Sequence, residues 1–377
     1  MVNSGKRSLS QKHKARYALA VGSIDPNQDL LFSRRADFPF VAVKSPRIIW
    51  KQRQLKPDLP PEPRLYPTLS DEDWKAAINN IINSEERAKC SQVRIINVSL
   101  LDNYIRHYFH FMESLYAIYC AKREIFPNAK IERIYIGDYD TWSMPKQGGG
   151  VQKKMLDLLF PEATVDAGKE IVEEGVENWL IVDRTKARTR HNKMVEPMEL
   201  LVHKHTPELR KTVFEKLRIT PATSPFQNGK LTRTPNILYS SRKGSKRDFA
   251  PDVEAKLLEL LKRIGNVREI NFADCLWEEQ VRLSAAHDVM IGIHGNNLTN
   301  FMWLPPDSTC IEIFPKESRA YDYQMQAEFF GHFYGGIDGE KIYPAFSRTS
   351  FPYGEIHSGV DYFPRQQLLL LLRKYLQ

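Results

Sequence analysis

Two short stretches of this chain carry the residue types best suited to binding an anion. The first, SSRKGSKR at residues 240–247, follows a strand-like run and offers hydroxyls, four cations and a glycine. A guanidinium such as that of Arg242 can hold two diphosphate oxygens at once, whereas Lys246 acts as a point charge. The stretch therefore predicts a diphosphate site, with a solvated charged surface as the alternative. Arg247, farther along the loop, is expected to matter much less than Arg242.

The second stretch, HGNNLTN at residues 294–300, follows the apolar run VMIGI and precedes a short helical pattern. Gly295 allows an unusual backbone φ or a close approach to a ligand. Asn296 tolerates the left-handed region, and Asn297 is a good N-cap for the helix that follows. The free N–H groups of a first helical turn form an anion site. The alternative is an ordinary capped turn with a hydrogen-bonded His294.

Two further groups of residues could act in catalysis or in metal binding. His110 and Glu113 fall on one face of a predicted helix, where the carboxylate could orient the imidazole as a general base. His107 is a rival histidine, and a packed histidine among aromatic side chains is the alternative. Asp138 and Asp140 form a D-x-D pair that could hold a divalent ion but is also common in plain turns. Because the cationic loop already offers neutralising charge, a metal is not favoured.

Alternating hydrophobic patterns predict the elements that position these residues. In the first half they indicate a helix capped by Ser70, then strands at 93–101, 131–138 and 178–183, with helices at 104–124, 151–160 and 195–218. In the second half they indicate strands at 236–241, 267–272, 288–293 and 309–314, with helices at 252–264, 276–286, 297–304, 321–331 and 364–376. Such alternation predicts an α/β protein with two Rossmann-like halves and a cleft between them. Ligands of such sheets bind beyond the carboxyl ends of the strands.

Composition divides the chain into four segments. We predict a basic, Pro-rich arm at 1–68, an N-terminal α/β acceptor domain at 69–222, a Rossmann-like nucleotide-sugar domain at 223–350 and a C-terminal helix segment at 351–377. The polar, turn-rich run TPATSPFQNGKLTRTP marks the internal boundary. The arm's excess charge lies outside both α/β patterns, so we expect the arm to serve localisation and not catalysis.

The distribution of charge and the apolar runs indicate which partners and which cellular compartment to expect. Residues 1–60 hold twelve Lys/Arg against four Asp/Glu, which would suit an anionic membrane surface. The arm lacks the interleaved aromatic residues of a single-strand binder, so no nucleic-acid partner is expected. No apolar run approaches the ~20 residues that span a bilayer, no signal peptide is evident and the four cysteines are scattered. We expect a cytoplasmic protein, peripheral at a membrane if the arm binds one.

The ordered set SSRKGSKR, HGNNLTN and LPPDSTCIEIFP resembles glycosyltransferase family 61, which includes plant xylosyltransferases and EGF-domain O-linked N-acetylglucosaminyltransferases. The residues that carry the resemblance are Ser241, Arg242, His294, Gly295, Leu298, Asn300, Pro305, Pro306 and Glu312. Two positions depart from the pattern. Asn296 stands where the family usually has a small residue, and Asp307 stands where it usually has glycine.

The resemblance implies an inverting, GT-B-like glycosyltransferase that moves a sugar from a nucleotide-sugar donor, expected to be UDP-linked, to a hydroxyl of a glycan or glycoprotein acceptor. No cofactor is expected to be required. The donor-binding candidates are Ser241, Arg242, Lys246, His294, Gly295, Asn296, Asn297, Asn300 and Glu312, and the catalytic candidates are His110 and Glu113. The alternatives are a nucleotide-sugar epimerase or hydrolase of the same fold, and a non-enzymatic nucleic-acid binder that uses the basic arm.

Overall fold

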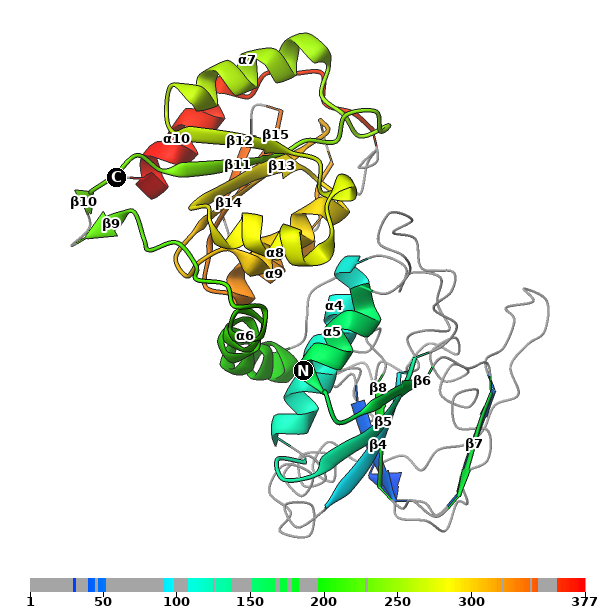
Figure 1. Cartoon of the computed structure of the whole chain (residues 1–377). Helices are drawn as coiled ribbons and strands as arrows, with labels where there is room; N and C mark the ends of the chain where they lie inside the picture. The colour runs from blue at the N-terminus through cyan, green and yellow to red at the C-terminus, as the bar shows by residue number, and fades with distance from the viewer. Residues whose placement is uncertain are drawn as a thin grey trace, which may run out of the picture. The chain divides into compact units, whose positions relative to one another are not determined.

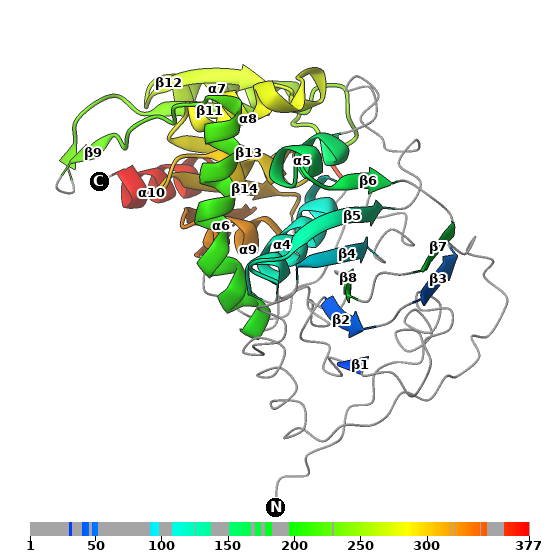
Figure 2. The same cartoon turned by 60° about the horizontal axis from the view of Figure 1, so that its bottom comes forward.

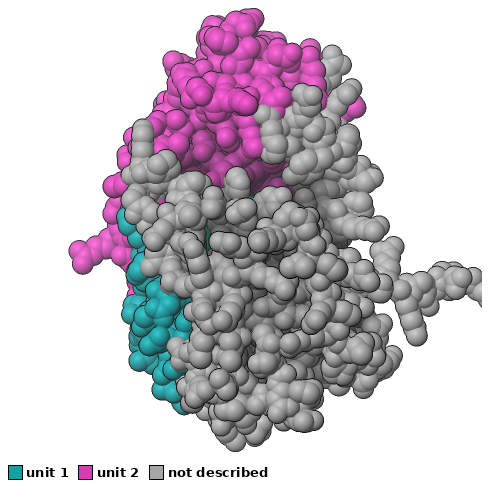
Figure 3. Space-filling model, turned by 90° about the vertical axis from the view of Figure 1, so that its right-hand side faces the viewer, with its two compact units in different colours: residues 1–142, 152–189, 195–198 teal, residues 143–151, 190–194, 199–377 magenta. Residues whose placement is uncertain are grey.

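The chain forms two compact units in a computed structural model (Figures 1 and 3). Unit 1 contains Met1–Trp142, Gln152–Thr189 and Val195–Met198, and unit 2 contains Ser143–Val151, Arg190–Met194 and Glu199–Gln377. The structure describes residues 30–31, 40–44, 47–51, 91–97, 108–124, 126–136, 151–166, 170–174, 178–182, 196–227, 230–316, 318–320, 322–339, 341–344 and 358–376. The predicted Ser70 helix, Asp138 and Asp140 lie outside these residues.

A six-stranded sheet forms the centre of unit 1. Its order is β1 (Leu30–Leu31), β2 (Phe40–Lys44), β8 (Asn178–Val182), β4 (Gln92–Asn97), β5 (Lys130–Ile136) and β6 (Thr164–Asp166). The strands from β8 to β6 are parallel, and β1 and β2 extend the sheet antiparallel. Helix α4 (Tyr108–Glu124) follows β4, and α5 (Val151–Leu159) follows β5 (Figure 2). This repeated strand–helix order keeps β4, β5 and β6 parallel.

Part of the segment expected to be an arm belongs to this fold. Strand β2 pairs with β8 from Phe40↔Val182 to Lys44↔Asn178. Strand β3 (Arg47–Lys51) pairs antiparallel with β7 (Glu170–Glu174) in a separate two-stranded sheet. The short apolar runs FVAV and IIW were hidden in sequence by the basic residues and prolines around them. The prediction of an arm outside the fold was therefore wrong for residues 40–44 and 47–51.

Unit 2 contains a second six-stranded sheet with helices on both faces. Its order is β12 (Asn266–Ile270), β11 (Asn236–Ser240), β13 (Val289–Ile293), β14 (Thr309–Phe314), β15 (Phe333–Asp338) and β16 (Lys341–Pro344). All strands are parallel except β16. Helices α7 (Pro251–Lys262) and α10 (Arg365–Leu376) cover one face, and α8 (Trp277–Ala285) and α9 (Asp322–Phe329) cover the other (Figure 1). The α/β class is confirmed.

Helix α6 (Glu196–Leu217) lies with unit 2 over most of its length, although the sequence grouped it with the N-terminal domain. The buried guanidinium of Arg210 donates through Nη1 to the carbonyls of Leu304 (3.0 Å) and Phe330 (3.2 Å). Thr206 donates to the carbonyl of Phe329 at 2.5 Å. These bonds satisfy carbonyls at the ends of two elements of unit 2. Within the described residues, no helix is both long and apolar enough to cross a membrane.

Candidate functional site

The two loops singled out in the sequence leave adjacent parallel strands of unit 2. Strand β11 ends at Ser240 and β13 ends at Ile293, and Ser240 pairs in register with Gly292. The loops that follow therefore start side by side at the carboxyl edge of the sheet, where α/β proteins bind ligands. A hydrogen bond from Asn297 Nδ2 to the carbonyl of Ser241 (3.3 Å) ties them together.

Gly295 makes room for an arginine from the neighbouring loop. Its φ is +147°, which disfavours any residue with a side chain. A Cβ at this position would lie 1.9 Å from Arg242 Nη1 and 3.1 Å from Arg247 Nη1. Both guanidinium groups therefore converge on the backbone of Gly295. Arg247 was expected to matter much less than Arg242 because it lies farther along the loop, but its guanidinium reaches the same glycine.

A tight turn explains why these two arginines meet. The N–H of Ser245 donates to the carbonyl of Arg242 at 3.0 Å, and Gly244 adopts a φ of +81°. The Asp248 carboxylate accepts from the N–H of Gly244 at 3.1 Å and so closes the loop. The chain reverses direction and brings residue 247 back beside residue 242.

Arg242 has unsatisfied hydrogen-bonding capacity. Its Nε and Nη1 atoms are buried and have no hydrogen-bond partner in the described part of the chain. Burial lowers the pKa of Arg242, and the positive charge of Arg247 lowers it further. Buried polar groups in proteins are almost always paired, so a hydrogen-bond acceptor next to these atoms would be favourable. An anion beside Gly295 would satisfy these nitrogen atoms.

The other cations of the loop point elsewhere or stay in solvent. Lys243 forms ion pairs with Glu269 and, at 3.7 Å, with Glu254. Lys246, a donor-binding candidate, is exposed. Ser241 is buried, and its Oγ accepts from the N–H of Lys243 at 3.4 Å. Ser241 therefore helps to shape the loop.

His294 is held by a buried carboxylate. Its Nδ1 lies 2.5 Å from Glu312 Oε1, and Tyr334 Oη donates to Glu312 Oε2 at 2.5 Å. Burial raises the pKa of Glu312, and the His294 and Tyr334 contacts oppose that rise. The imidazole also stacks on Phe314 (5.5 Å) and meets the edge of Tyr323 (5.3 Å). Both oxygens of Glu312, a donor-binding candidate, contact side chains of the protein, so Glu312 braces the His294 loop.

The asparagines hold the loop in place. The 3-10 helix η6 (Asn296–Trp303) begins one residue earlier than expected, so Gly295 occupies the cap position and no side chain caps it. The expectation that Asn297 is the N-cap was therefore wrong. Asn300 is 1% exposed and donates from Nδ2 to Gln280 Oε1 at 3.1 Å. Asn296 Oδ1 accepts from Thr299 Oγ1 at 3.4 Å.

Sequence reasoning missed several of these partners. Gln280 lies on α8, and its Nε2 donates to the carbonyls of Phe272 (2.9 Å) and Cys275 (3.1 Å). Tyr334 lies on β15, a strand that the sequence pattern did not predict. Neither residue belongs to a recognisable motif, so only the packing of the sheet brings them to the site.

The side chains of the two catalytic candidates of unit 1 are in contact, as predicted. His110 Nδ1 lies 3.0 Å from Glu113 Oε2 in the first turns of α4, where Glu113 is 2% exposed and His110 is partly exposed. The pair has the geometry of an oriented histidine base. The described residues contain no group of three or more His, Cys, Asp or Glu side chains that could hold a metal.

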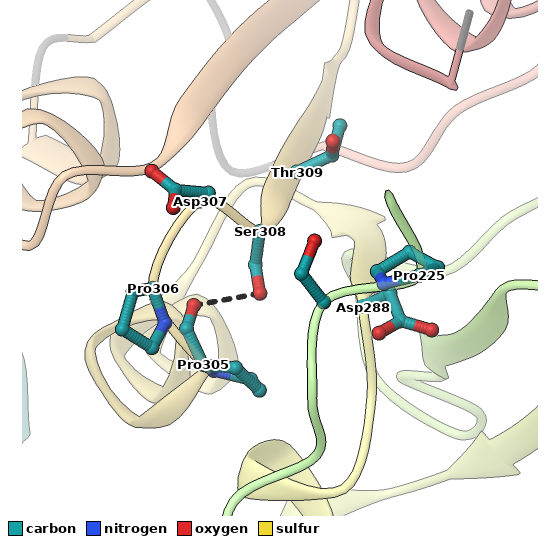
Figure 4. Close-up of a pocket in the computed structure, with 8 residues that line it drawn as sticks. Pro225, Asp288, Pro305, Pro306, Asp307, Ser308 and Thr309 are labelled. Atoms are coloured by element: carbon teal, nitrogen blue, oxygen red, sulfur yellow. Dashed lines mark hydrogen bonds between the residues drawn. The ribbon is translucent and has the colours of Figure 1, made fainter. Parts of the chain in front are cut away.

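A small hollow lies at the opposite edge of the unit 2 sheet (Figure 4). Its lining includes Asp288 and residues 305–309, at the amino ends of β13 and β14, and Ser308 Oγ donates to the Pro305 carbonyl at 2.7 Å. Asp307 has a φ of +60°, a backbone conformation that glycine adopts more easily than a residue with a side chain. This hollow is separated from the arginine loops by the length of the strands.

The comparison with known families agrees with these features. The family model described as Glycosyltransferase 61 matches residues 108–311, which is more than half of the chain. The match begins with α4, includes the loops at 240–247 and 294–300 and ends one residue before Glu312. A search of curated proteins gives no match. On the family match, the chain belongs to glycosyltransferase family 61.

Proposed function

We propose that this protein is an inverting glycosyltransferase of GT-B-like organisation. In this proposal, unit 2 binds a nucleotide-sugar donor, expected to be UDP-linked, and unit 1 serves the acceptor, a glycan or glycoprotein hydroxyl. Membership of the family supports glycosyl transfer in general. The observation that carries the donor site is the partly buried guanidinium of Arg242, whose Nε and Nη1 lack a partner in the described structure at the carboxyl edge of a parallel sheet.

The proposed reaction is a single displacement. A base removes the proton of the acceptor hydroxyl as its oxygen attacks the anomeric carbon, and the bond from that carbon to the diphosphate oxygen breaks on the opposite side. We assign the base to His110, oriented by Glu113. Arg242, His294 and the loop N–H groups stabilise the negative charge that develops on the nucleoside diphosphate.

We propose that no divalent cation is required, because two guanidinium groups already face the diphosphate position. Full activity in excess chelator is the expected result. Activity that is lost on chelation and restored by Mn²⁺ would overturn this part of the proposal and would turn attention to Asp138 and Asp140.

Replacement of Arg242 tests the donor site. Arg242→Ala should weaken UDP binding and lower kcat, with a combined cost of about 2–4 kcal/mol. Arg242→Lys should recover only part of this, because an ammonium cannot replace a two-pronged guanidinium. Calorimetry with UDP and steady-state kinetics provide the measurements, and circular dichroism checks the fold.

The matched control is Arg263→Ala. Arg263 is exposed near the end of α7 and forms an ion pair with Glu259. If Arg242→Ala binds UDP and turns over as the wild type does, the donor site lies elsewhere. Rapid turnover of a nucleotide sugar without acceptor would favour an epimerase or hydrolase instead.

A further inference from the structure

Two arginines, rather than one, face the position proposed for the diphosphate. The Nη1 atoms of Arg242 and Arg247 lie 1.9 Å and 3.1 Å from the point where a Cβ of Gly295 would be. Two guanidinium groups that both approach this point repel each other. Burial strengthens the repulsion because water screens it less. The pKa of Arg242 is lowered by Arg247, as expected for two neighbouring cations.

We propose that Arg247 is a second diphosphate-binding residue, which forms with Arg242 a two-arginine clamp over Gly295. This inference rests on the proposed function. Each guanidinium carries several donors in a fixed plane, and a diphosphate offers oxygen acceptors on both phosphorus atoms. Bound between the two groups, the diphosphate neutralises their mutual repulsion and satisfies the unpaired Nε and Nη1 of Arg242.

The backbone that carries Arg247 is fixed from the C-terminal side. The N–H of Val360 donates to the carbonyl of Asp248 at 3.0 Å, and the N–H of Ala250 donates to the carbonyl of Val360 at 2.9 Å. A Cβ at Gly359 would lie 2.7 Å from the Asp248 carbonyl oxygen, so the backbone at Gly359 packs directly against the backbone at Asp248. Arg247 therefore extends from a backbone held on both sides, which suits a preorganised ligand contact.

The clamp makes a prediction about ligand chemistry. Two arginines that share one diphosphate should favour a ligand with two phosphates over a ligand with one. Loss of Arg247 should therefore weaken UDP binding more than UMP binding. It should also weaken binding of inorganic pyrophosphate, which has no base or ribose.

The experiment compares the full-length wild type with Arg247→Gln, Arg242→Gln and Arg263→Gln by calorimetry with UDP, UMP and pyrophosphate. We expect Arg247→Gln and Arg242→Gln each to weaken UDP and pyrophosphate by about ten- to a hundredfold, as for loss of a charged hydrogen-bond partner. Arg263→Gln should bind as the wild type does. Arg247→Lys, which keeps the charge but loses the fork, should fall between the wild type and Arg247→Gln.

The outcomes separate this inference from the proposed function. A wild type that binds neither UDP nor pyrophosphate removes the support for the donor site itself. If the wild type binds both and Arg242→Gln is impaired, but Arg247→Gln and Arg247→Lys bind as the wild type does, the clamp is overturned and the donor site stands. A uniform loss of UMP and UDP affinity in Arg247→Gln also overturns the clamp, because it indicates a general charge effect. Thermal unfolding of each variant shows whether the fold is intact.

Discussion

At the scale of single residues, Gly295 has two separate reasons to be glycine. Its φ of +147° excludes most side chains, and the guanidinium of Arg242 occupies the space that a Cβ would need. The first reason concerns the stability of the backbone, whereas the second concerns the position of an arginine proposed to bind the donor. A pair of variants can separate the two.

We expect Gly295→Ala to lower both stability and UDP affinity, the affinity by about tenfold or more, because the methyl group displaces a charged ligand contact. Gly331→Ala is the matched control, since Gly331 has a φ of +72° but no atom within 4 Å of the point where its Cβ would be. The control should lose stability alone, by about 1–2 kcal/mol. Urea denaturation and UDP calorimetry provide the two readouts. Equal UDP affinity in Gly295→Ala and Gly331→Ala would contradict the close approach of Arg242.

Glu312 gives a pH dependence whose sign follows from its burial. Burial raises the pKa of this carboxyl above its usual value of 4.5. The folded protein therefore holds the Glu312 proton more tightly than the unfolded chain does. The stability that results is fully present below pH 4.5 and is lost as pH rises through the folded pKa.

Glutamine at this position has no proton to lose. The free energy of unfolding of the wild type, minus that of Glu312→Gln, should therefore decrease as pH rises from about 4 towards neutrality. Denaturant titrations of both proteins across this range provide the measurement. A difference that stays constant or grows with pH would show that the carboxylate is not penalised by burial.

At the scale of elements, the sequence predicted the second half of the chain best. The predicted helix 252–264 is α7 (Pro251–Lys262), and the predicted strand 288–293 is β13 (Val289–Ile293). Strand β15 escaped notice because its sequence FYGGID contains a glycine pair, which usually indicates a turn. In the fold, a Cβ at Gly335 would lie 2.7 Å from the methyl groups of Leu371, so glycine lets α10 approach the strand. The glycine at position 335 is therefore explained by the packing of α10 on the strand and not by a turn.

The attachment of α6 can be tested through Arg210. Burial lowers the pKa of this guanidinium to about 10, yet its Nη1 satisfies the carbonyls of Leu304 and Phe330. Arg210→Met removes the charge but leaves both carbonyls unsatisfied, so we expect a loss of about 1–3 kcal/mol in the free energy of unfolding. Lys211→Met, one residue along and exposed in an ion pair with Glu215, should change it by less than about 0.5 kcal/mol. Similar unfolding midpoints for the two variants would mean that α6 is not anchored by Arg210.

At the scale of the whole molecule, the local sequence pattern predicted where the loops at 240–247 and 294–300 leave the sheet but not how they fold. Parallel pairing of β11 and β13 follows from the alternation of strands and helices, and it places both loops at one edge. The convergence of Arg247 on Arg242 depends on the turn at Gly244 and on the contact of residues 358–360 with Asp248. That contact joins segments more than a hundred residues apart, which no local motif reveals.

The structure differs most from the sequence prediction in the N-terminal region. A detachable arm could be deleted through residue 55 with little effect on unit 1. The structure instead places β2 beside β8 and β3 beside β7, so this deletion removes a strand neighbour from each of them. The edge of β8 would then present unpaired N–H and C=O groups, which destabilise the fold and favour aggregation.

Two truncations of different length test this change. Deletion of residues 1–28 removes five Lys/Arg but keeps every described strand, so its melting temperature should stay within a few degrees of that of the full-length protein. The protein that lacks residues 1–55 should unfold at a clearly lower temperature or aggregate, with a loss of β signal in circular dichroism.

Turnover on a soluble acceptor should follow the same order, since the shorter deletion leaves α4 and its His110–Glu113 pair supported by an intact sheet. Equal stability and turnover in the two truncations would mean that β1, β2 and β3 contribute nothing to unit 1, and would restore the arm as a separate segment.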